Sequence, residues 1–239
     1  MKHVKISKSQ KAQKSNLQIQ MIDVAWNAMT DSLKLSELAA VKICHDLAGP
    51  IGAINNGIEL LKEPDGDLHQ ESLELVEMSA KEAVSKLLYL RQALGSGSPQ
   101  GESNINNLME IADNYFTNSK ITLRWNLPQT SNGTVATVPS PVAKQILNMI
   151  LLVSGSLIMG GDMLVNVVQN GKNTSVKIRG ESSVVKLADD VLFMLDGNTN
   201  NEDINVKNML PYLIYLTGKE NNSPVTIEHS QTHVEVCYN

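Results

Sequence analysis

The stretch of sequence that decides the fold runs from Val41 to Leu61 and reads VKICHDLAGPIGAINNGIELL. It lies in a longer segment, residues 31–61, in which apolar residues recur every three or four positions, the spacing of one helix face. The residues on this face are Ala40, Ile43, Cys44, Leu47, Ile51, Ile54, Ile58 and Leu61. The pattern predicts one long helix that starts near Asp31 or Ser32 and packs Cys44 inside the protein.

A second helical pattern follows a turn at residues 63–67 and ends at the linker Gly95-Ser96-Gly97-Ser98-Pro99. Its apolar residues are Leu68, Leu75, Met78, Val84, Leu87, Leu88 and Leu94. The two helices form a hairpin, and nothing within the hairpin covers its apolar face. Two hairpins can bury these faces against each other as a four-helix bundle, so we expect a homodimer through residues 31–94.

The sequence after the linker mixes helical patterns with short alternating ones. Helices are expected over residues 104–118, 141–159, 184–195 and 205–217, and strands near 121–125, 162–169, 174–180, 224–229 and 233–238. Helices interleaved with antiparallel strands favour a two-layer α/β sandwich. The expected organisation is a basic, mobile tail (1–30), the helical hairpin domain (31–95), a linker (96–103) and an α/β domain (104–239).

Composition excludes several classes of protein. The 239 residues are 42% hydrophobic and carry a net charge of −5, which is ordinary for a globular protein and gives no reason to expect a nucleic-acid partner. Two cysteines are too few for a disulfide scaffold or a cysteine-built zinc site. The most apolar stretch, residues 146–159, is shorter than the roughly 20 residues that span a bilayer, so no membrane span is expected.

The first twenty residues contain five lysines, no acidic residue and no apolar segment of the kind found in signal peptides. We therefore expect a cytoplasmic protein. The lysines form either a solvated tail or an arm that touches a membrane or a nucleic acid.

His45 is the candidate reactive residue. At about 100° per residue, the apolar face of its helix centres near 200° from His45, so the imidazole should project away from the core, and Gly49, Gly52 and Asn56 fall within about 40° of it. Interior glycines cost up to about 1 kcal/mol each, and Pro50 bends a helix. Several residues that are unfavourable in a helix share this face, and such a combination indicates a functional site. A surface without large side chains would let another protein bring a phosphoryl group close to His45. A lone histidine, in contrast, is usually only a surface residue.

Residues near His45 are candidates for a partner-docking surface. Asp46 either orients the imidazole or is a solvated charge. In a hairpin that turns near residue 65, the residues that lie beside His45 are expected near position 85. Lys86 is one of them, and it is either a docking residue or a solvated lysine. The expected docking residues are Lys42, Gly49, Gly52, Asn56, Ser85, Lys86 and Tyr89.

The run His45-Asp46-Leu47-Ala48-Gly49-Pro50 resembles the phospho-accepting H-box of two-component histidine kinases. A longer pattern is similar to the bacterial histidine phosphotransferase ChpT family. It comprises Cys44-His45-Asp46, Gly49-Pro50, Ile54, Gly57, Glu59-Leu60-Leu61 and Arg91-Gln92-Ala93-Leu94-Gly95. The resemblance implies a dimeric four-helix bundle with a degenerate, kinase-like ATPase domain on each hairpin. It adds Arg91 to the docking candidates, unless Arg91 only holds the hairpin to the second domain.

The nucleotide-binding motifs of the second domain differ from those that an active histidine kinase of this fold needs. The candidate N-box is residues 145–153, and if Asn148 is its first asparagine, Leu152 stands where the magnesium ligand should be. Leucine has no oxygen to offer Mg²⁺. The glycine-rich loops that hold adenine and phosphates are also missing near residues 178–182 and 205–209. We therefore expect no bound cofactor, no ATP binding and no autophosphorylation.

The resemblance implies a phosphorelay in which His45 and Asp46 are the catalytic residues. His45 is expected to take a phosphoryl group from an aspartyl phosphate on one receiver domain and to pass it to a second receiver. Mg²⁺ would belong to the receiver, not to this chain. By family resemblance the partners are receiver domains of a hybrid histidine kinase and of CtrA-like response regulators. The alternatives are an active histidine kinase and a non-catalytic, receiver-binding scaffold.

Overall fold

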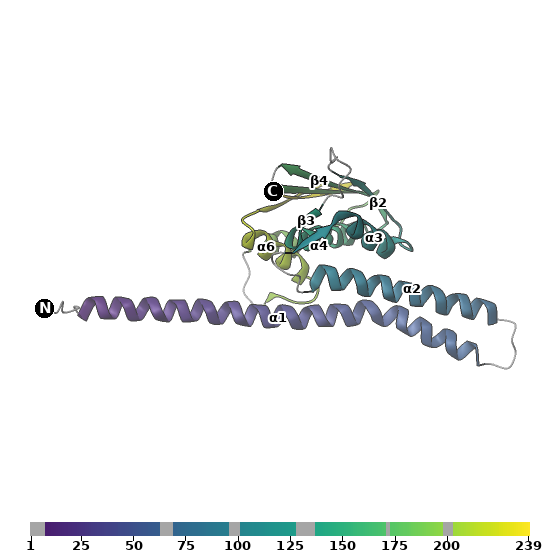
Figure 1. Ribbon diagram of the computed structural model, residues 1–239, viewed down its shortest axis with the longest axis horizontal. Helices are drawn as coiled ribbons and strands as arrows, with labels where there is room; N and C mark the ends of the chain where they lie inside the picture. The colour runs from purple at the N-terminus through teal and green to yellow at the C-terminus, as the bar shows by residue number, and fades with distance from the viewer. Residues whose placement is uncertain (1–7, 63–68, 96–100, 128–136, 171–172, 198–202) are drawn as a thin grey trace.

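The computed structural model describes residues 8–62, 69–95, 101–127, 137–170, 173–197 and 203–239. Two long helices, α1 (Lys8–Leu60) and α2 (His69–Leu94), form the predicted hairpin, and a mixed α/β domain lies along one side of it (Figure 1). The turn expected at residues 63–67 and most of the expected linker lie outside the described residues.

Helix α1 begins at Lys8, well before the start expected near Asp31. Residues 8–30 therefore continue the helix where the sequence predicted a tail. They contain neither glycine nor proline, so nothing in their backbone chemistry stops the helix. Pro50 lies inside α1, and Figure 1 shows this helix bending toward its C-terminal end. A bend is the expected result where proline removes a backbone hydrogen bond.

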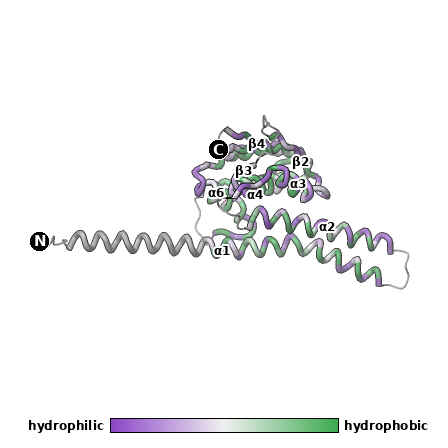
Figure 2. Tube along the Cα trace, in the orientation of Figure 1, coloured by the Kyte–Doolittle hydropathy of each residue, from purple (hydrophilic) through white to green (hydrophobic). Residues whose placement is uncertain are grey.

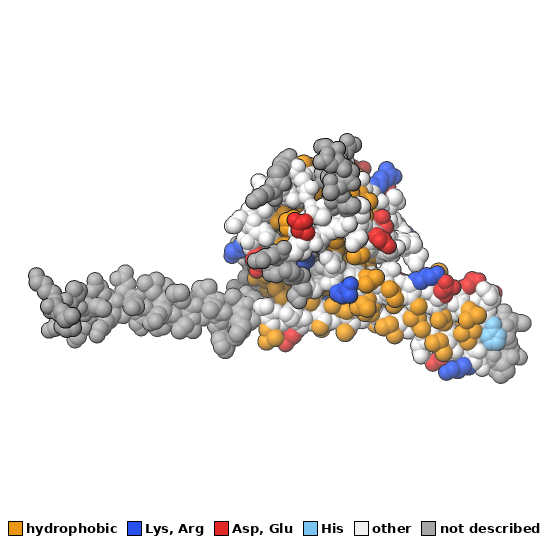
Figure 3. All heavy atoms as spheres, in the orientation of Figure 1, with side chains coloured by type: hydrophobic (Ala, Val, Ile, Leu, Met, Phe, Trp, Pro, Cys, Tyr) orange, Lys and Arg blue, Asp and Glu red, His pale blue; other side chains and the backbone are white. Residues whose placement is uncertain are grey.

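The hairpin packs closely at Gly57. A Cβ at this position would lie 2.6 Å from Cγ2 of Val76 and 3.2 Å from the carbonyl oxygen of Ser72, so only glycine lets α1 and α2 approach this far. Hydrophilic and hydrophobic residues alternate along α2 and the coloured part of α1 (Figure 2), and hydrophobic side chains gather along the visible face of the hairpin (Figure 3). The large apolar side chains of the two helices that stay exposed are Leu33, Val41, Ile51, Ile58, Leu60, Leu73, Met78, Val84, Leu87 and Leu88.

The α/β domain contains four helices and seven strands among the described residues. The helices are α3 (Ile105–Phe116), α4 (Ser140–Ser156), α5 (Asp189–Leu195) and α6 (Met209–Glu220). The strands are β1 (Glu102–Asn104), β2 (Ile121–Asn126), β3 (Thr137–Pro139), β4 (Gly161–Asn170), β5 (Asn173–Glu181), β6 (Val225–His229) and β7 (His233–Tyr238). Helices α3, α4 and α6 lie between the sheet and the hairpin (Figure 1), so the predicted two-layer arrangement is confirmed.

The main sheet has the strand order β2-β4-β5-β7-β6. Its hairpins β4–β5 and β6–β7 are antiparallel as expected, whereas β2 pairs with β4 in parallel, a pairing that the sequence did not predict. Helix α4 lies between these two strands in the sequence and serves as the long connection that parallel strands require. The two-stranded sheet of β1 and β3 was not predicted, because three-residue strands carry no periodic signal.

Two buried hydrogen bonds join the hairpin to the α/β domain. The hydroxyl of Tyr89 on α2 donates to the carbonyl oxygen of Leu147 on α4 at 2.8 Å. The side-chain amide of Asn148 donates to the carbonyl oxygen of Ala93 on α2 at 2.9 Å. These bonds run in opposite directions between the same two helices, so the α/β domain is fixed in place on α2. No helix in the described part of the chain is long and apolar enough to cross a membrane.

Candidate functional site: the histidine face of the hairpin

The imidazole of His45 stands out from α1 with 84% of the side chain exposed. This agrees with the direction that the helical wheel predicts. The surface beside it is bare, because a Cβ added at Gly49 or Gly52 would meet no atom within 4 Å. Asn56, one turn further along this face, is exposed as well. A partner can therefore reach His45 without meeting a side chain on the adjacent two turns.

Asp46 lies next to His45 and is much less exposed, at 17% of its side chain. Its Oδ1 is 3.3 Å from Nδ1 of His45, and its Oδ2 accepts a hydrogen bond from Nζ of Lys42 at 2.9 Å. A proton on Nδ1 can point to the carboxylate, and this arrangement leaves the lone pair on Nε2. Asp46 is thus placed to orient the imidazole, and Lys42 is engaged by Asp46.

Tyr89 is not on the docking surface, and this prediction was wrong. Its side chain is fully buried and its hydroxyl is bonded to α4, because this position of α2 faces the α/β domain. Burial raises the pKa of the Tyr89 hydroxyl well above its ordinary value, with a smaller contribution from Tyr115. A hairpin considered without the domain packed on it gives no sign that one of its faces is covered.

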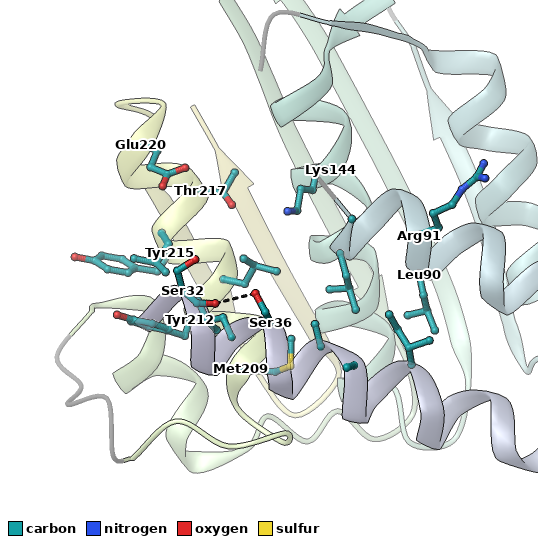
Figure 4. Close-up of a pocket in the computed structure, with 18 of the residues that line it drawn as sticks. Ser32, Ser36, Leu90, Arg91, Lys144, Met209, Tyr212, Tyr215, Thr217 and Glu220 are labelled. Carbon is teal, nitrogen blue, oxygen red and sulfur yellow. Dashed lines mark hydrogen bonds between the residues drawn. The ribbon is translucent and has the colours of Figure 1, made fainter. Parts of the chain in front are cut away.

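The other docking candidates on α2 lie at different depths. Ser85 is half-buried, and Lys86 is ion-paired to Glu82 at 2.7 Å. Arg91 is exposed at the edge of a groove of about 1100 Å³ that lies between α1, α2, α4 and α6. Figure 4 shows Arg91 on the α2 side of this groove and Lys144 on the α4 side. His45 is not among the lining residues, so Arg91 belongs to a different surface feature.

Cys44 is exposed on α1, whereas the sequence predicted that it packs in the core. Its helix position matches that of the exposed apolar residue Ile51, seven residues further along α1. Because one chain does not cover this apolar face of the hairpin, the apolar spacing of the sequence does not lead to burial of Cys44. In the described part of the chain, no group of three or more histidine, cysteine or acidic residues is arranged to hold a metal ion.

Sequence reasoning missed Tyr115, which lies in the last turn of α3 and lines a surface hollow together with Ser85 and Lys86 of α2. Its ring centroid lies 4.3 Å from that of Tyr89. Burial, followed by the negative charges of Asp46 and Glu82, raises the pKa of Tyr115 to about 12. The only sequence signal was an aromatic pair, Tyr115-Phe116, in a chain with 4% aromatic residues. Nothing in that pair indicates that Tyr115 stacks on Tyr89 of α2.

Comparisons with known proteins define the class of this protein. Residues 105–233 match the family described as the histidine phosphotransferase C-terminal domain, and the chain belongs to this family. It is 28% identical over 197 residues to protein phosphotransferase ChpT of Brucella abortus (strain 2308), a match that covers 82% of this chain and 90% of that protein. A solved structure of a bacterial phosphotransferase superposes with a TM-score of 0.75 at 26% identity, covering 87% of this chain and 96% of that one. The predicted resemblance to the ChpT family is therefore confirmed.

Proposed function

We propose that this phosphotransferase carries a phosphoryl group between receiver domains on His45, and that it does so without ATP. The observation that carries the proposal is the geometry at His45. The imidazole is exposed, the adjacent helix surface is bare, and a carboxylate engages the ring nitrogen that does not need to react.

The proposed chemistry is two reversible displacements. The lone pair on Nε2 of His45 attacks the phosphorus of an aspartyl phosphate on a receiver domain; a P–N bond forms, the O–P bond breaks, and the receiver's carboxylate leaves. A carboxylate of a second receiver then attacks the phosphohistidine and releases the imidazole. Asp46 stabilises the positive ring through Nδ1–H, and the receiver supplies Mg²⁺ and further positive charge. This chain contributes mainly position.

Independence from ATP is supported by the packing of α4. Asn148, the first candidate N-box asparagine, is fully buried and bonded to Ala93, and Leu152 on the same face is buried too. Gln145, three residues before Asn148, is bonded to the carbonyl oxygen of Ile214 on α6. This face of α4 is therefore occupied by α2 and α6, and it carries no residue that replaces the missing magnesium ligand.

The receiver-docking surface that we propose is the bare face of α1 with the adjacent part of α2. It comprises Gly49, Gly52, Asn56, Ser85 and Lys86 around the His45–Asp46 pair. We also propose that the exposed apolar side chains of the hairpin pair two chains as a four-helix bundle. Exposed apolar surface on this scale is typical of an interface.

A phosphotransfer profile tests the proposed function. Purified receiver domains, each carrying a radiolabelled aspartyl phosphate, are mixed with the wild-type protein, with His45→Gln and with the control His69→Gln. The control changes an exposed histidine at the start of α2. We expect wild type and the control to take up label and to pass it to a second receiver, and His45→Gln to take up none. Label on His45→Gln would refute the proposed site.

The same experiment separates the two alternative functions. Labelling of the protein by ATP alone, without a receiver, would show an active histidine kinase. Binding of receivers by the wild type with no transfer of label would show a scaffold. Either result would replace the proposed function.

A further inference from the structure

The groove of about 1100 Å³ between the hairpin and the α/β domain is separate from the histidine face (Figure 4). It is slightly larger than the pockets of about 300–1,000 Å³ that hold small molecules in proteins. Its apolar lining is mainly aliphatic and comes from three helices. Examples are Leu35 and Ile43 of α1, Leu90 and Leu94 of α2, and Met209 and Leu216 of α6. The groove therefore offers a long apolar surface to a ligand.

The charged residues of this groove are mostly cations. Arg91, Lys144 and Lys219 line it, and among the described residues Glu220 is the one acidic side chain beside them. The chain as a whole is acidic, with a net charge of −5, so this local excess of positive charge is not a property of the surface in general. Such a charge distribution favours an anionic ligand.

Lys144 is the cation that reaches into the groove. Figure 4 shows its side chain pointing from α4 into the groove. The side chain is half-buried, and within the part of the chain that the structure describes it has no hydrogen-bond or ion-pair partner. Burial lowers the pKa of the Lys144 ammonium group, and the negative charge of Glu220 opposes this change. A half-buried ammonium group is thus left without the paired anion that would offset its lost hydration.

We propose that this groove binds an amphipathic anion, with an unbranched aliphatic chain on the apolar lining and a carboxylate or phosphate head group at Lys144. Burial of the chain supplies affinity, and a charge-assisted hydrogen bond to Lys144 fixes the position of the head group. Arg91 and Lys219 add positive charge at the rim, where Nζ of Lys219 lies 5.7 Å from the centroid of the Tyr215 ring. The inference does not involve His45, so a failure of the proposed function would leave it standing.

The first test measures which ligand chemistry the protein binds. The full chain is titrated by calorimetry with decanoate, decyl phosphate, decanol and decyltrimethylammonium, all below the concentrations at which micelles form. We expect both anions to bind at least about tenfold more tightly than decanol or the cation, because only they pair with Lys144. Equal binding of all four would show adsorption to apolar surface in general and would overturn the proposal. Inorganic phosphate bound as tightly as decyl phosphate would do the same, because the chain would then contribute nothing.

The second test removes the charge inside the groove. Lys144→Met keeps the unbranched stem of the side chain, and Lys186→Met changes an exposed lysine outside the groove as the matched control. We expect Lys144→Met to bind decanoate about tenfold more weakly and decanol within about twofold of wild type. Unchanged decanol binding shows that the groove is intact in the variant. Decanoate bound equally well by wild type and Lys144→Met contradicts the proposal.

The third test locates the ligand and distinguishes it from a second copy of the chain. Ser36→Trp places a large ring in the groove, whereas Ala48→Trp places one at an exposed position of α1 outside it. We expect only Ser36→Trp to lose decanoate binding, and a Ser36→Trp protein that binds as wild type would place the ligand elsewhere.

Leu87 lines the groove and is also one of the exposed apolar residues of the hairpin. The double variant Ile51→Glu/Val84→Glu, designed to keep two chains apart, should therefore be titrated as well. We expect it to bind decanoate as wild type does. Binding by this variant alone would show that a second chain fills the groove in the wild type, and the proposal would fall.

Discussion

At the scale of single residues, the site depends on how each side chain is placed by its neighbours. His45 and Asp46 are adjacent in sequence, yet one is solvent-exposed and the other is nearly enclosed. The difference follows from the 100° step between consecutive helical residues, which turns Asp46 toward the α/β domain. His45 could be found from the sequence because its signal is local. The burial of Tyr89 could not be found in this way, because it is caused by the α/β domain that the tertiary fold packs on α2.

The buried hydroxyl of Tyr89 should contribute measurably to stability. Tyr89→Phe removes a hydrogen bond to Leu147 and leaves a buried carbonyl oxygen without that partner. We expect the free energy of unfolding to fall by about 1 kcal/mol, the usual net value of such a bond. Urea titration measures this, with Tyr215→Phe, at a half-buried tyrosine of α6, as the control. Equal stability of wild type and Tyr89→Phe would mean that this bond does not hold the domains together.

The raised pKa of Tyr115 predicts that the protein loses stability at alkaline pH. Its folded pKa of about 12 lies above the ordinary value of 10, so the folded state keeps the phenolic proton that the unfolded state loses. This contribution is fully present below pH 10 and disappears as the pH rises toward 12. Tyr115→Phe has no such proton, so the difference in unfolding free energy between wild type and variant should shift in favour of the variant over this range. Denaturation of both proteins from pH 9 to 11 measures the trend, and a constant difference would contradict it.

At the scale of elements, helix α1 shows where a sequence pattern is reliable and where it stops. The periodicity and the glycines correctly indicated a helix with one bare face. The pattern did not indicate that the helix begins at Lys8, because the start signal at Asp31 competes with a preceding stretch that is equally able to be helical. The parallel pairing of β2 with β4 was also missed, since pairing between distant strands is set by the path of α4 and not by either strand's own residues.

Substitutions on the bare face of α1 should change the stability of the protein and its phosphotransfer rate in opposite directions. Alanine at Gly49 or Gly52 meets no neighbour and suits a helix better, so each change should raise the free energy of unfolding by up to about 1 kcal/mol. The added methyl groups should slow phosphotransfer from receivers if partners dock here. Thermal unfolding and single-turnover transfer measure the two effects. Gly57→Ala is the contrasting control and should destabilise, since its Cβ would meet Val76. More stable variants with undiminished transfer would rule out docking on this face.

At the scale of the whole molecule, the hairpin exposes an apolar face that one chain cannot bury. The described residues place this face on α1 and α2, apart from the surface that the α/β domain covers. The spacing of apolar residues predicted the hairpin and a partner that covers its apolar face. It could not show what that cover is, because a helix pattern records which side is apolar and not which molecule meets it.

We expect two chains to pair through the exposed apolar side chains of their hairpins. Ile51 and Val84 are each 55% exposed. Replacing each by Glu places a charge in the proposed interface, where burial of an unpaired charge is costly. We expect light scattering at micromolar concentration to return a dimer mass for wild type and a monomer mass for Ile51→Glu/Val84→Glu. Lys81→Glu, on an exposed part of α2, should remain dimeric. A monomeric wild type would end the four-helix-bundle proposal.

We propose that one imidazole, that of His45, carries the phosphoryl group, and locating this group on the protein is the decisive measurement. The protein is incubated with a phosphorylated receiver, digested at alkaline pH, where phosphohistidine survives, and mapped by mass spectrometry. We expect a single acid-labile phosphate on the peptide that contains His45, attached at Nε2 when the ring is examined by NMR. A phosphate on any other residue, or none at all after a receiver has lost its own, would contradict it.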